Sequence, residues 1–341
     1  MGVDLGDAIP REKIELQDIG GWTLAVDAYN TLYQFLAIIR GPSGEHLKDS
    51  RGRVTSHISG LFYRNINLME LGIRLVYVFD GKPPELKAEE IERRSAQRRE
   101  AKDQYLKALQ AGETAQARKY AEASTVLRRD MVADSKQLLD AMGIPYVDAP
   151  SEGEAQASVM AAEGSVNAVA SQDHDSIIFG APVLVRNVTI SGKRRLPSKG
   201  IVINVRPERI TLQSVMAATG LTREQLVDFA ILLGTDFNPD GFEGVGPVRA
   251  LKYLKRHGSL EKVAELKEQV SKVNYPAIRE LYMHPPAIPG IRPEWKQPDP
   301  QAILSYLVDE HSFSSDRVQA ALARVAATTR PKSETLEKWF G

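Results

Sequence analysis

The sequence predicts an α/β fold with a mainly parallel central sheet, and three observations support this prediction. Apolar, β-rich runs that end in aspartate occupy residues 22–29 (WTLAVDAY) and 74–81 (RLVYVFDG). Weaker runs of the same form occupy residues 144–150 (IPYVDAP) and 167–173 (NAVASQD). Helical patterns lie between these runs, and alternating strands and helices are typical of parallel α/β sheets.

Helices are expected on both sides of the second strand. LYQFLAII (32–39) follows the first strand, and ISGLFYRNINLMELG (58–72) precedes the second. A long stretch rich in charged residues and alanine runs from Lys87 to Met142. Without further information, this stretch fits a solvated surface helix with ion pairs one turn apart as well as a mobile arm that contacts phosphates.

The second half of the chain is expected to be mostly helical from residue 201 onward. TREQLVDFAILLGTDF (222–237) is an apolar helix that ends near Gly234, and 241–263 reads as two helices around a glycine-rich loop. The many prolines of 275–300 predict an extended crossing segment.

Composition excludes several classes of protein. The 341 residues are 43% hydrophobic and 26% charged, which is ordinary for a globular chain. No apolar run reaches the ~20 residues of a membrane-spanning helix. The start, MGVDLGDAIPREKIEL, lacks the pattern of a signal peptide, so we expect an intracellular protein, monomeric by default. Cysteine is absent, which excludes a thiolate nucleophile and disulfides.

Acidic residues follow the expected strands. Because ligand-binding residues of parallel sheets gather beyond the carboxyl ends of the strands, Asp27, Asp80 and Asp173 are expected at one edge. Each acid alone could simply favour a turn or a helix start. The full set contains two acid-x-acid pairs, and its members are Asp27, Asp80, Glu152, Glu154, Asp173, Asp175 and Asp236.

Seven converging carboxylates would need cations. Two unit charges 4 Å apart repel by roughly 1 kcal/mol in water and by about 4 kcal/mol at an effective dielectric constant of 20. Oxygen ligands favour Mg²⁺ or Mn²⁺, and a pair of such ions is the usual device for phosphodiester hydrolysis.

Other site chemistries have less support. The six histidines are scattered and none has the spacing of a zinc site. The phosphate-binding and nucleophile-elbow glycine motifs are absent from the sequence. Asp173 and Asp175 alone resemble the acid pair of some phosphatases, but that interpretation leaves the other acids unexplained.

Two further features favour a phosphate-rich ligand. The loop Gly244-Val245-Gly246-Pro247 would present backbone N–H groups near a helix start, although it could be a structural turn. Cations beside a metal site would also steer and clamp a phosphate. Such a basic patch follows Asp80 and consists of Lys82, Lys87, Arg93, Arg94, Arg98 and Arg99. With such a local patch, a chain whose Lys+Arg equals its Asp+Glu, at 44 each, could still bind a polyanion.

At these residues the chain resembles the structure-specific 5′ nucleases, and closely the flap endonucleases of archaea and eukaryotes. The resemblance covers essentially the whole chain. The matching motifs, in order, are MGVDLGD, VDAYNTLYQFL, YVFDGKPPELK, APSEGEAQA, SQDHDS, LLGTDF and GVGPVRAL.

The resemblance implies a PIN-like nuclease core with a helical arch over 87–136 and a helix–two-turn–helix DNA-binding element. One metal group would comprise Asp27, Asp80, Glu152 and Glu154, and the other Asp173, Asp175 and Asp236. Lys87 and Arg94 match the basic pair that contacts the scissile phosphate. The implied cofactors are two Mg²⁺ ions, for which Mn²⁺ substitutes, and a K⁺ ion at the glycine-rich loop.

The resemblance also implies contacts with DNA and a protein partner. The positions that match DNA contacts are Gly2, Tyr33, Arg40, Arg64, Gly234, Gly244 and Gly246. Leu336, Trp339 and Phe340 match a motif that binds the sliding clamp (PCNA), with Ser333 where glutamine is usual.

The implied organisation is an N-terminal nuclease region (1–98), an arch linker (99–115), an internal nuclease region with the helix–two-turn–helix (116–258), a helical and extended region (259–332) and the clamp-binding tail (333–341).

The expected function is Mg²⁺-dependent cleavage of branched DNA with a 5′ flap, with accompanying 5′–3′ exonuclease activity. The biological tasks implied are maturation of lagging-strand fragments and long-patch base excision repair. The location would be the cytoplasm and nucleoid of an archaeon or the nucleus of a eukaryote. Two alternatives remain: a non-catalytic junction-binding scaffold recruited by the clamp, and a Mg²⁺-dependent phosphomonoesterase for small molecules.

Overall fold

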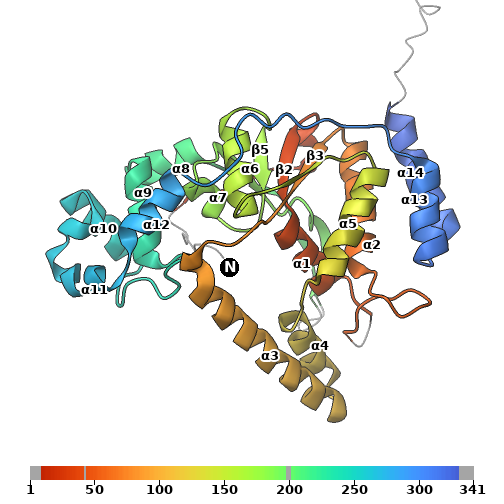
Figure 1. The fold of residues 1–341 in the computed structure, drawn as a ribbon, viewed down its shortest axis with the longest axis horizontal. Helices are drawn as coiled ribbons and strands as arrows, with labels where there is room; N and C mark the ends of the chain where they lie inside the picture. The colour runs from red at the N-terminus through yellow and green to blue at the C-terminus, as the bar shows by residue number, and fades with distance from the viewer. Residues whose placement is uncertain (1–8, 42–43, 197–200, 330–341) are drawn as a thin grey trace, which may run out of the picture.

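A computed structural model describes residues 9–41, 44–196 and 201–329, and Figure 1 shows its central sheet with helices on both faces. The sheet has seven strands in the order β1-β9-β6-β5-β2-β3-β4. Strands β4, β3, β2, β5 and β6 are parallel, β9 is antiparallel to β6, and β1 is antiparallel to β9. The strands are β1 (Glu12–Lys13), β2 (Thr23–Asp27), β3 (Arg74–Phe79), β4 (Tyr146–Asp148), β5 (Ala168–Ala170), β6 (Val183–Arg186) and β9 (Glu208–Thr211). A separate hairpin pairs β7 (Gly192–Leu196) with β8 (Ile201–Val205).

The predicted parallel sheet is confirmed, and the four predicted strands are β2, β3, β4 and β5. Every residue of β2 is buried, as expected for a central strand with both faces covered. The helical half begins later than predicted, at Leu212, because residues 201–211 form β8 and β9. Pro207 lies between these two strands and ends the first of them.

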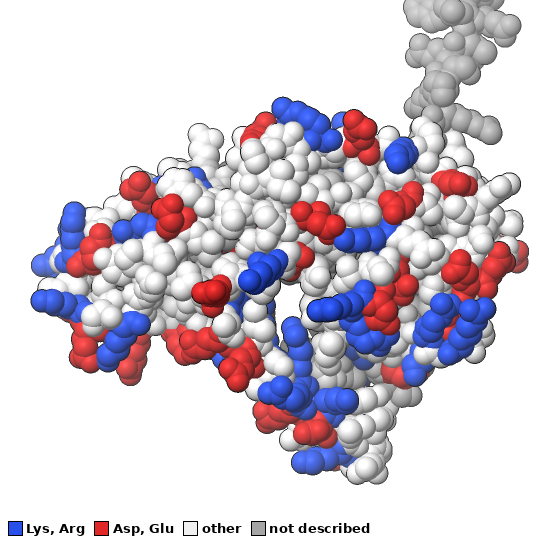
Figure 2. Space-filling model, in the orientation of Figure 1, with Lys and Arg blue, Asp and Glu red and all other residues white. Residues whose placement is uncertain are grey.

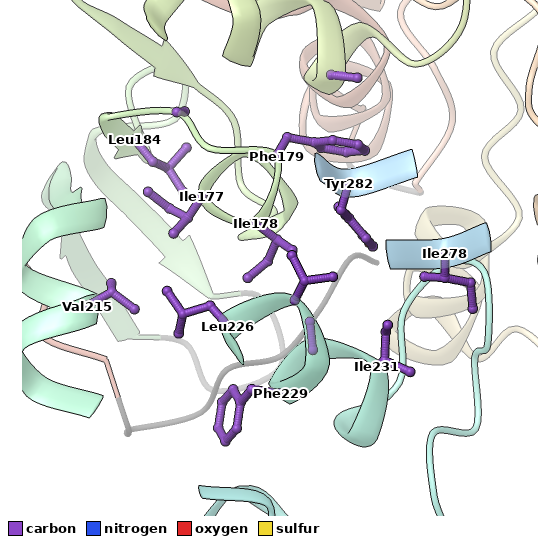
Figure 3. Packing of buried hydrophobic residues seen from close by; sticks show 14 of the residues in the cluster. Ile177, Ile178, Phe179, Leu184, Val215, Leu226, Phe229, Ile231, Ile278 and Tyr282 are labelled. Atoms are coloured by element: carbon purple, nitrogen blue, oxygen red, sulfur yellow. The ribbon is translucent and has the colours of Figure 1, made fainter. Parts of the chain in front are cut away.

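Successive side chains of the strands pack into two hydrophobic cores, one on each face of the sheet. Leu24 and Val26 face one core, which is covered by helices α1 (Ala28–Ile38), α2 (Ser56–Glu70), α5 (Arg129–Ala141), α13 (Pro300–Leu304) and α14 (Ser315–Thr329). Ala25 faces the other core, whose packing Figure 3 shows. The helices there are α6 (Gly153–Ala162), α7 (Asp175–Ile178), α8 (Leu212–Thr219), α9 (Arg223–Leu233) and α12 (Tyr275–Met283).

Two helices project from the body as an arch (Figure 1). They are α3 (Ala88–Gln110) and α4 (Thr114–Ala123), which pack against each other. Gly112 turns the chain between them with φ +72°, a conformation that glycine adopts without strain. The charged stretch predicted from the sequence is therefore three helices, α3, α4 and α5.

A helix–turn–helix unit lies at one end of the molecule (Figure 1). Helix α9 begins with a capping box formed by Thr222 and Gln225, and α10 (Pro247–His257) begins after the glycine-rich loop. The unit continues through short 3₁₀ turns at Leu260–Lys262 and Ala264–Leu266 into α11 (Lys267–Lys272).

The proline-rich segment is only partly extended, so the prediction for 275–300 is wrong over its first residues. Asn274 caps α12, and Pro276 sits in the first helical turn, where its missing N–H has no cost. The rest crosses the molecule, and its backbone N–H groups at Lys296 and Asp299 donate to the carbonyl oxygens of Gly143 and Ala141 at 3.0 and 2.8 Å.

A π-helical turn at Ser305–Glu310 joins α13 to α14, and further 3₁₀ turns lie at Leu16–Ile19 and Glu85–Lys87. Across 9–41, 44–196 and 201–329, no helix is long and apolar enough to cross a membrane.

Candidate active site

Strand ends and helix starts bring the predicted acids together at the carboxyl edge of the sheet. Asp27 ends β2, and its Oδ1 accepts a hydrogen bond from the backbone N–H of Asn30 at 3.0 Å, which caps α1. Asp80 directly follows β3, and its Oδ1 accepts from the backbone N–H of Gly153 at 2.6 Å. The strand order reverses beside β2, which is where ligands bind in open α/β sheets.

A glycine allows the two acidic loops to meet. The backbone N–H of Gly81 donates to the carbonyl oxygen of Ser151 at 2.6 Å. A Cβ atom on Gly81 would lie 2.0 Å from the carbonyl oxygen of Ala149, so no other residue fits there without moving the backbone. This contact holds Asp80 beside Glu152, the residue that precedes α6.

Hydroxyl and amide groups orient two more acids. Glu154 Oε1 accepts hydrogen bonds from the hydroxyls of Ser171 at 2.5 Å and Ser176 at 3.4 Å. The side-chain amide of Asn30 donates to Asp173 Oδ2 at 3.0 Å. These bonds connect α1, α6 and the loop after β5 across the sheet edge.

Two cations at the base of the arch reach into the acids. Lys87 Nζ lies 3.0 Å from Asp236 Oδ2 and also bonds Glu152. Arg94 Nη2 lies 2.6 Å from Asp236 Oδ1. Asp175, the first residue of α7, is 5% exposed. The predicted acids and the basic pair thus form one connected cluster.

Burial and mutual repulsion raise the pKa of four acids. Burial, followed by the charge of Asp80, raises the pKa of Asp27 to about 8. Burial also raises the pKa of Asp80 and of Glu152. Burial and the charge of Asp173 raise the pKa of Glu154. Such acids are stabilised in their charged form when a cation is nearby.

The donor set fits hard divalent cations, because every candidate ligand is a carboxylate. Burial raises the pKa of four of these acids, and a nearby cation would stabilise their charged form. In the arrangement seen over the described residues, no three acid or histidine side chains form a metal site. Lys87 and Arg94 bridge the carboxylates instead.

The side chains predicted to contact DNA lie on α1, just after α1 and on α2, and each contacts a different part of the protein. The guanidinium of Arg98 lies 5.0 Å from the ring centre of Tyr33. Arg40 donates to the carbonyl oxygen of Ala121 at 2.9 Å, so it joins the end of α1 to the arch. Arg64 lines a pocket of about 260 Å³ together with Phe35, and burial lowers its pKa.

The predicted glycines differ in what their backbone requires. Gly234 has φ +106°, and a Cβ atom there would lie 2.8 Å from the carbonyl oxygen of Pro239. Gly244 also has positive φ, whereas Gly246 has open space around it and ordinary φ. Gly234 therefore has a structural requirement of its own, whereas the backbone at Gly246 would accept a side chain. Gly2, Leu336, Trp339 and Phe340 lie outside the described residues.

Sequence reasoning missed several residues of the cluster. Asn30 lies three residues after Asp27, the spacing between a helix-capping residue and the N–H group that it accepts, and this signal was available. Ser171 stands two residues before Asp173 in SQDHDS. Glu90 stands four residues before Arg94, a spacing that predicts an ion pair on one helix face, so this signal was also available. Tyr282 gave no signal, because only the fold brings it to the acids.

Comparisons with known proteins find relatives over the whole chain. The family profile described as "XPG N-terminal domain" matches residues 8–101, and that described as "XPG I-region" matches residues 143–236. "Flap endonuclease 1" of Pyrococcus furiosus is 50% identical over 341 residues, which cover 100% of this chain and 99% of the relative.

Solved structures show the same fold. The flap endonuclease-1 of Methanococcus jannaschii superposes with a TM-score of 0.74 at 36% identity, covering 96% of this chain and 98% of the other. The catalytic core of Rad2 in complex with a DNA substrate superposes with a TM-score of 0.67 at 24% identity, covering 92% and 96%.

Proposed function

This chain belongs to the flap endonuclease family, and we propose that its acid cluster hydrolyses one phosphodiester of branched DNA with the aid of two divalent cations. The chain is a structure-specific flap endonuclease. Its roles would be Okazaki fragment maturation and long-patch base excision repair. The observation that carries the proposal is the convergence of acids from β2, β3, α6 and α7 on one sheet edge beside two arch cations.

The cations would be Mg²⁺, with Mn²⁺ as a substitute. Two groups of acids would hold them: Asp27, Asp80, Glu152 and Glu154 in one, and Asp173, Asp175 and Asp236 in the other. When bound, the cations activate the attacking water and neutralise charge on the phosphate and the leaving oxygen. The hydroxyls of Ser171 and Ser176 and the amide of Asn30 keep the carboxylates oriented.

Lys87 and Arg94 would clamp the scissile phosphate. Both already point from the arch base to Asp236, so a phosphate that arrives at the acids meets both cations at once. Fixed cations stabilise charge that develops on the phosphate in the transition state. Tyr33, one turn along α1 from Asn30, would stack on the base next to the cut, and Gly2 would lie nearby.

DNA would be held through its backbone. Figure 2 shows Lys and Arg side chains around the opening between the arch and the body, where a 5′ single strand would pass. The loop at Gly244 and Gly246, with Gly234 before it, would bind one duplex arm and a K⁺ ion. The exposed Arg249 and Lys252 beside that loop support this proposal. Arg40 and Arg64 would contact further phosphates.

The remaining assignments depend on the family, except for the monomeric state, which is the default. Leu336, Trp339 and Phe340 would bind the sliding clamp. The enzyme would act inside the cell as a monomer, in the cytoplasm and nucleoid if the source is archaeal. It would also remove nucleotides from 5′ ends as an exonuclease.

A double-flap DNA substrate tests the proposal. We expect cleavage near the junction with Mg²⁺ and none with EDTA, because the carboxylates cannot activate water alone. Asp173→Ala should abolish cleavage while flap DNA still binds. Cleavage that persists in EDTA would contradict the metal role, and binding without cleavage in Mg²⁺ would favour a junction scaffold. Turnover of p-nitrophenyl phosphate that does not need Arg94 would favour a phosphomonoesterase.

A further inference from the structure

Helix α3 carries one buried charge, Glu90. The helix is exposed along most of its length, and its other buried residues are the alanines Ala101 and Ala108. Glu90 is only 4% exposed. A carboxylate in that position is costly unless other groups compensate its charge, so its partners indicate its role.

Those partners are the two consecutive arginines of the same helix. Glu90 Oε1 lies 2.6 Å from Arg94 Nε, and Glu90 Oε2 lies 2.9 Å from Arg93 Nε. The arginines then diverge. Arg94 Nη2 reaches Asp236 Oδ1 at 2.6 Å, whereas Arg93 Nη1 reaches the exposed Asp240 at 3.0 Å. Only Arg94 therefore extends from Glu90 into the acid cluster.

The contact fixes both ends of one guanidinium. An arginine side chain has many rotamers, and ordering it during the reaction costs the entropy of that freedom. A carboxylate on Nε orients the guanidinium so that its Nη edge faces the acids, where a phosphate would arrive. Positive charge that is already oriented needs no rearrangement as charge develops on the phosphate.

We infer that Glu90 is a positioning residue that holds the Arg94 guanidinium over the acid cluster for the cleavage step. The inference rests on the proposed function, because it requires Arg94 to contact the scissile phosphate. Glu90 itself touches neither the acids nor, by this inference, the DNA; it acts through Arg94.

The test uses the full chain, a double-flap DNA and saturating Mg²⁺, and measures single-turnover cleavage and DNA affinity separately. Glu90→Gln should slow cleavage by about 5- to 10-fold and change the Kd for flap DNA by less than twofold. Glu89→Gln is the matched control, because it removes the same charge from the adjacent, exposed position. It should cleave within twofold of the parent rate.

A double-mutant cycle isolates the route through Arg94. Arg94→Ala should slow cleavage more than Glu90→Gln does. In the Arg94→Ala background, Glu90→Gln should change the rate by less than twofold. A full effect in that background would overturn the inference, because Glu90 would then act by another route. Unchanged cleavage by the single variant would overturn it as well.

The same data separate the inference from the function on which it rests. If Arg94→Ala cleaves at the parent rate, the proposed role of Arg94 fails. If Arg94→Ala is slow but Glu90→Gln is not, only the inference fails. Thermal melting checks folding, and Glu90→Asp, which keeps the charge but shortens the reach, should give an intermediate rate. Unfolding of both Glu90 variants would assign a structural role and overturn the inference.

Discussion

At the scale of the residue, burial controls the behaviour of Asp27. Its side chain is 6% exposed and faces Asp80 and Asp173. The resulting pKa of about 8 lies above its value of 3.8 in an unfolded chain. An acid with a raised pKa contributes stability below pH 3.8, and this contribution is lost as the pH rises toward 8.

Asp27→Asn should therefore stabilise the metal-free protein in alkaline solution. We expect little change in Tm near pH 4 and a gain on the order of a few degrees at pH 8 in EDTA, because the amide never has to ionise. Thermal melts at several pH values measure this. A lower Tm at pH 8 than in the parent would contradict the assigned cause of the pKa shift.

The buried hydroxyl of Tyr282 gives a second prediction, which concerns the free energy of unfolding. The hydroxyl of Tyr282 is fully buried and has no hydrogen-bond partner among the residues that the structure describes. Its ring packs against Phe179 with centroids 4.6 Å apart (Figure 3). Tyr282→Phe should raise the free energy of unfolding by up to about 1 kcal/mol, because it removes an unsatisfied polar group.

The control is Tyr77→Phe. The Tyr77 hydroxyl is also buried, but it donates to Asn65 Oδ1 at 2.7 Å. Its removal should lower the free energy of unfolding by about 1 kcal/mol. Urea unfolding measures both variants, and losses of equal size would show that the Tyr282 hydroxyl has a partner after all.

The sequence was sufficient to predict the acids that follow strands. It was not sufficient to predict the role of a residue that holds another side chain of the site in place. Asp27 and Asp80 could be predicted because a β-rich run that ends in an acid specifies the sheet edge. The role of Glu90 could not be predicted, because an ion pair one turn apart in a charged helix is typical of a solvated surface until the fold places Asp236 beside Arg94.

At the scale of the element, the turn after β3 determines whether the acids can converge. Gly81→Ala should lower the Tm by several degrees and reduce cleavage by more than 100-fold. The new Cβ would lie 2.0 Å from the carbonyl oxygen of Ala149, so the loops that carry Asp80 and Glu152 must separate. Gly246→Ala, which meets open space, should leave the Tm unchanged. A fully active Gly81→Ala enzyme would contradict this account of the turn.

Element boundaries were less predictable than element types. The charged stretch divides into α3 and α4 at Gly112, which has a positive φ. The presence of one glycine in the sequence does not predict this conformation. Helix α12 was not predicted, because the prolines of this region favour an extended segment. Pro276 lies in the first helical turn, where proline is tolerated. The antiparallel strand β9 pairs with β6, a long-range contact that no local pattern specifies.

At the scale of the whole molecule, the segment that would bind the clamp follows the last described helix, α14. Deletion of residues 333–341 should leave cleavage of free flap DNA within twofold of the parent, because the acid cluster and the arch are untouched. It should remove stimulation by the sliding clamp. Cleavage assays with and without the clamp measure this, and equal stimulation of the two forms would refute the tail assignment.

The proposed binding of duplex DNA and the proposed binding of the clamp involve opposite ends of the long axis of the molecule. Helix α10, beside the loop proposed to bind duplex DNA, and helix α14, the last described helix before the proposed clamp-binding segment, lie at opposite ends of that axis with the sheet between them (Figure 1). A ring-shaped clamp held after α14 would leave the far duplex arm accessible. The enzyme could then stay tethered while it exchanges one junction for the next, and the two partners would never compete for the same surface.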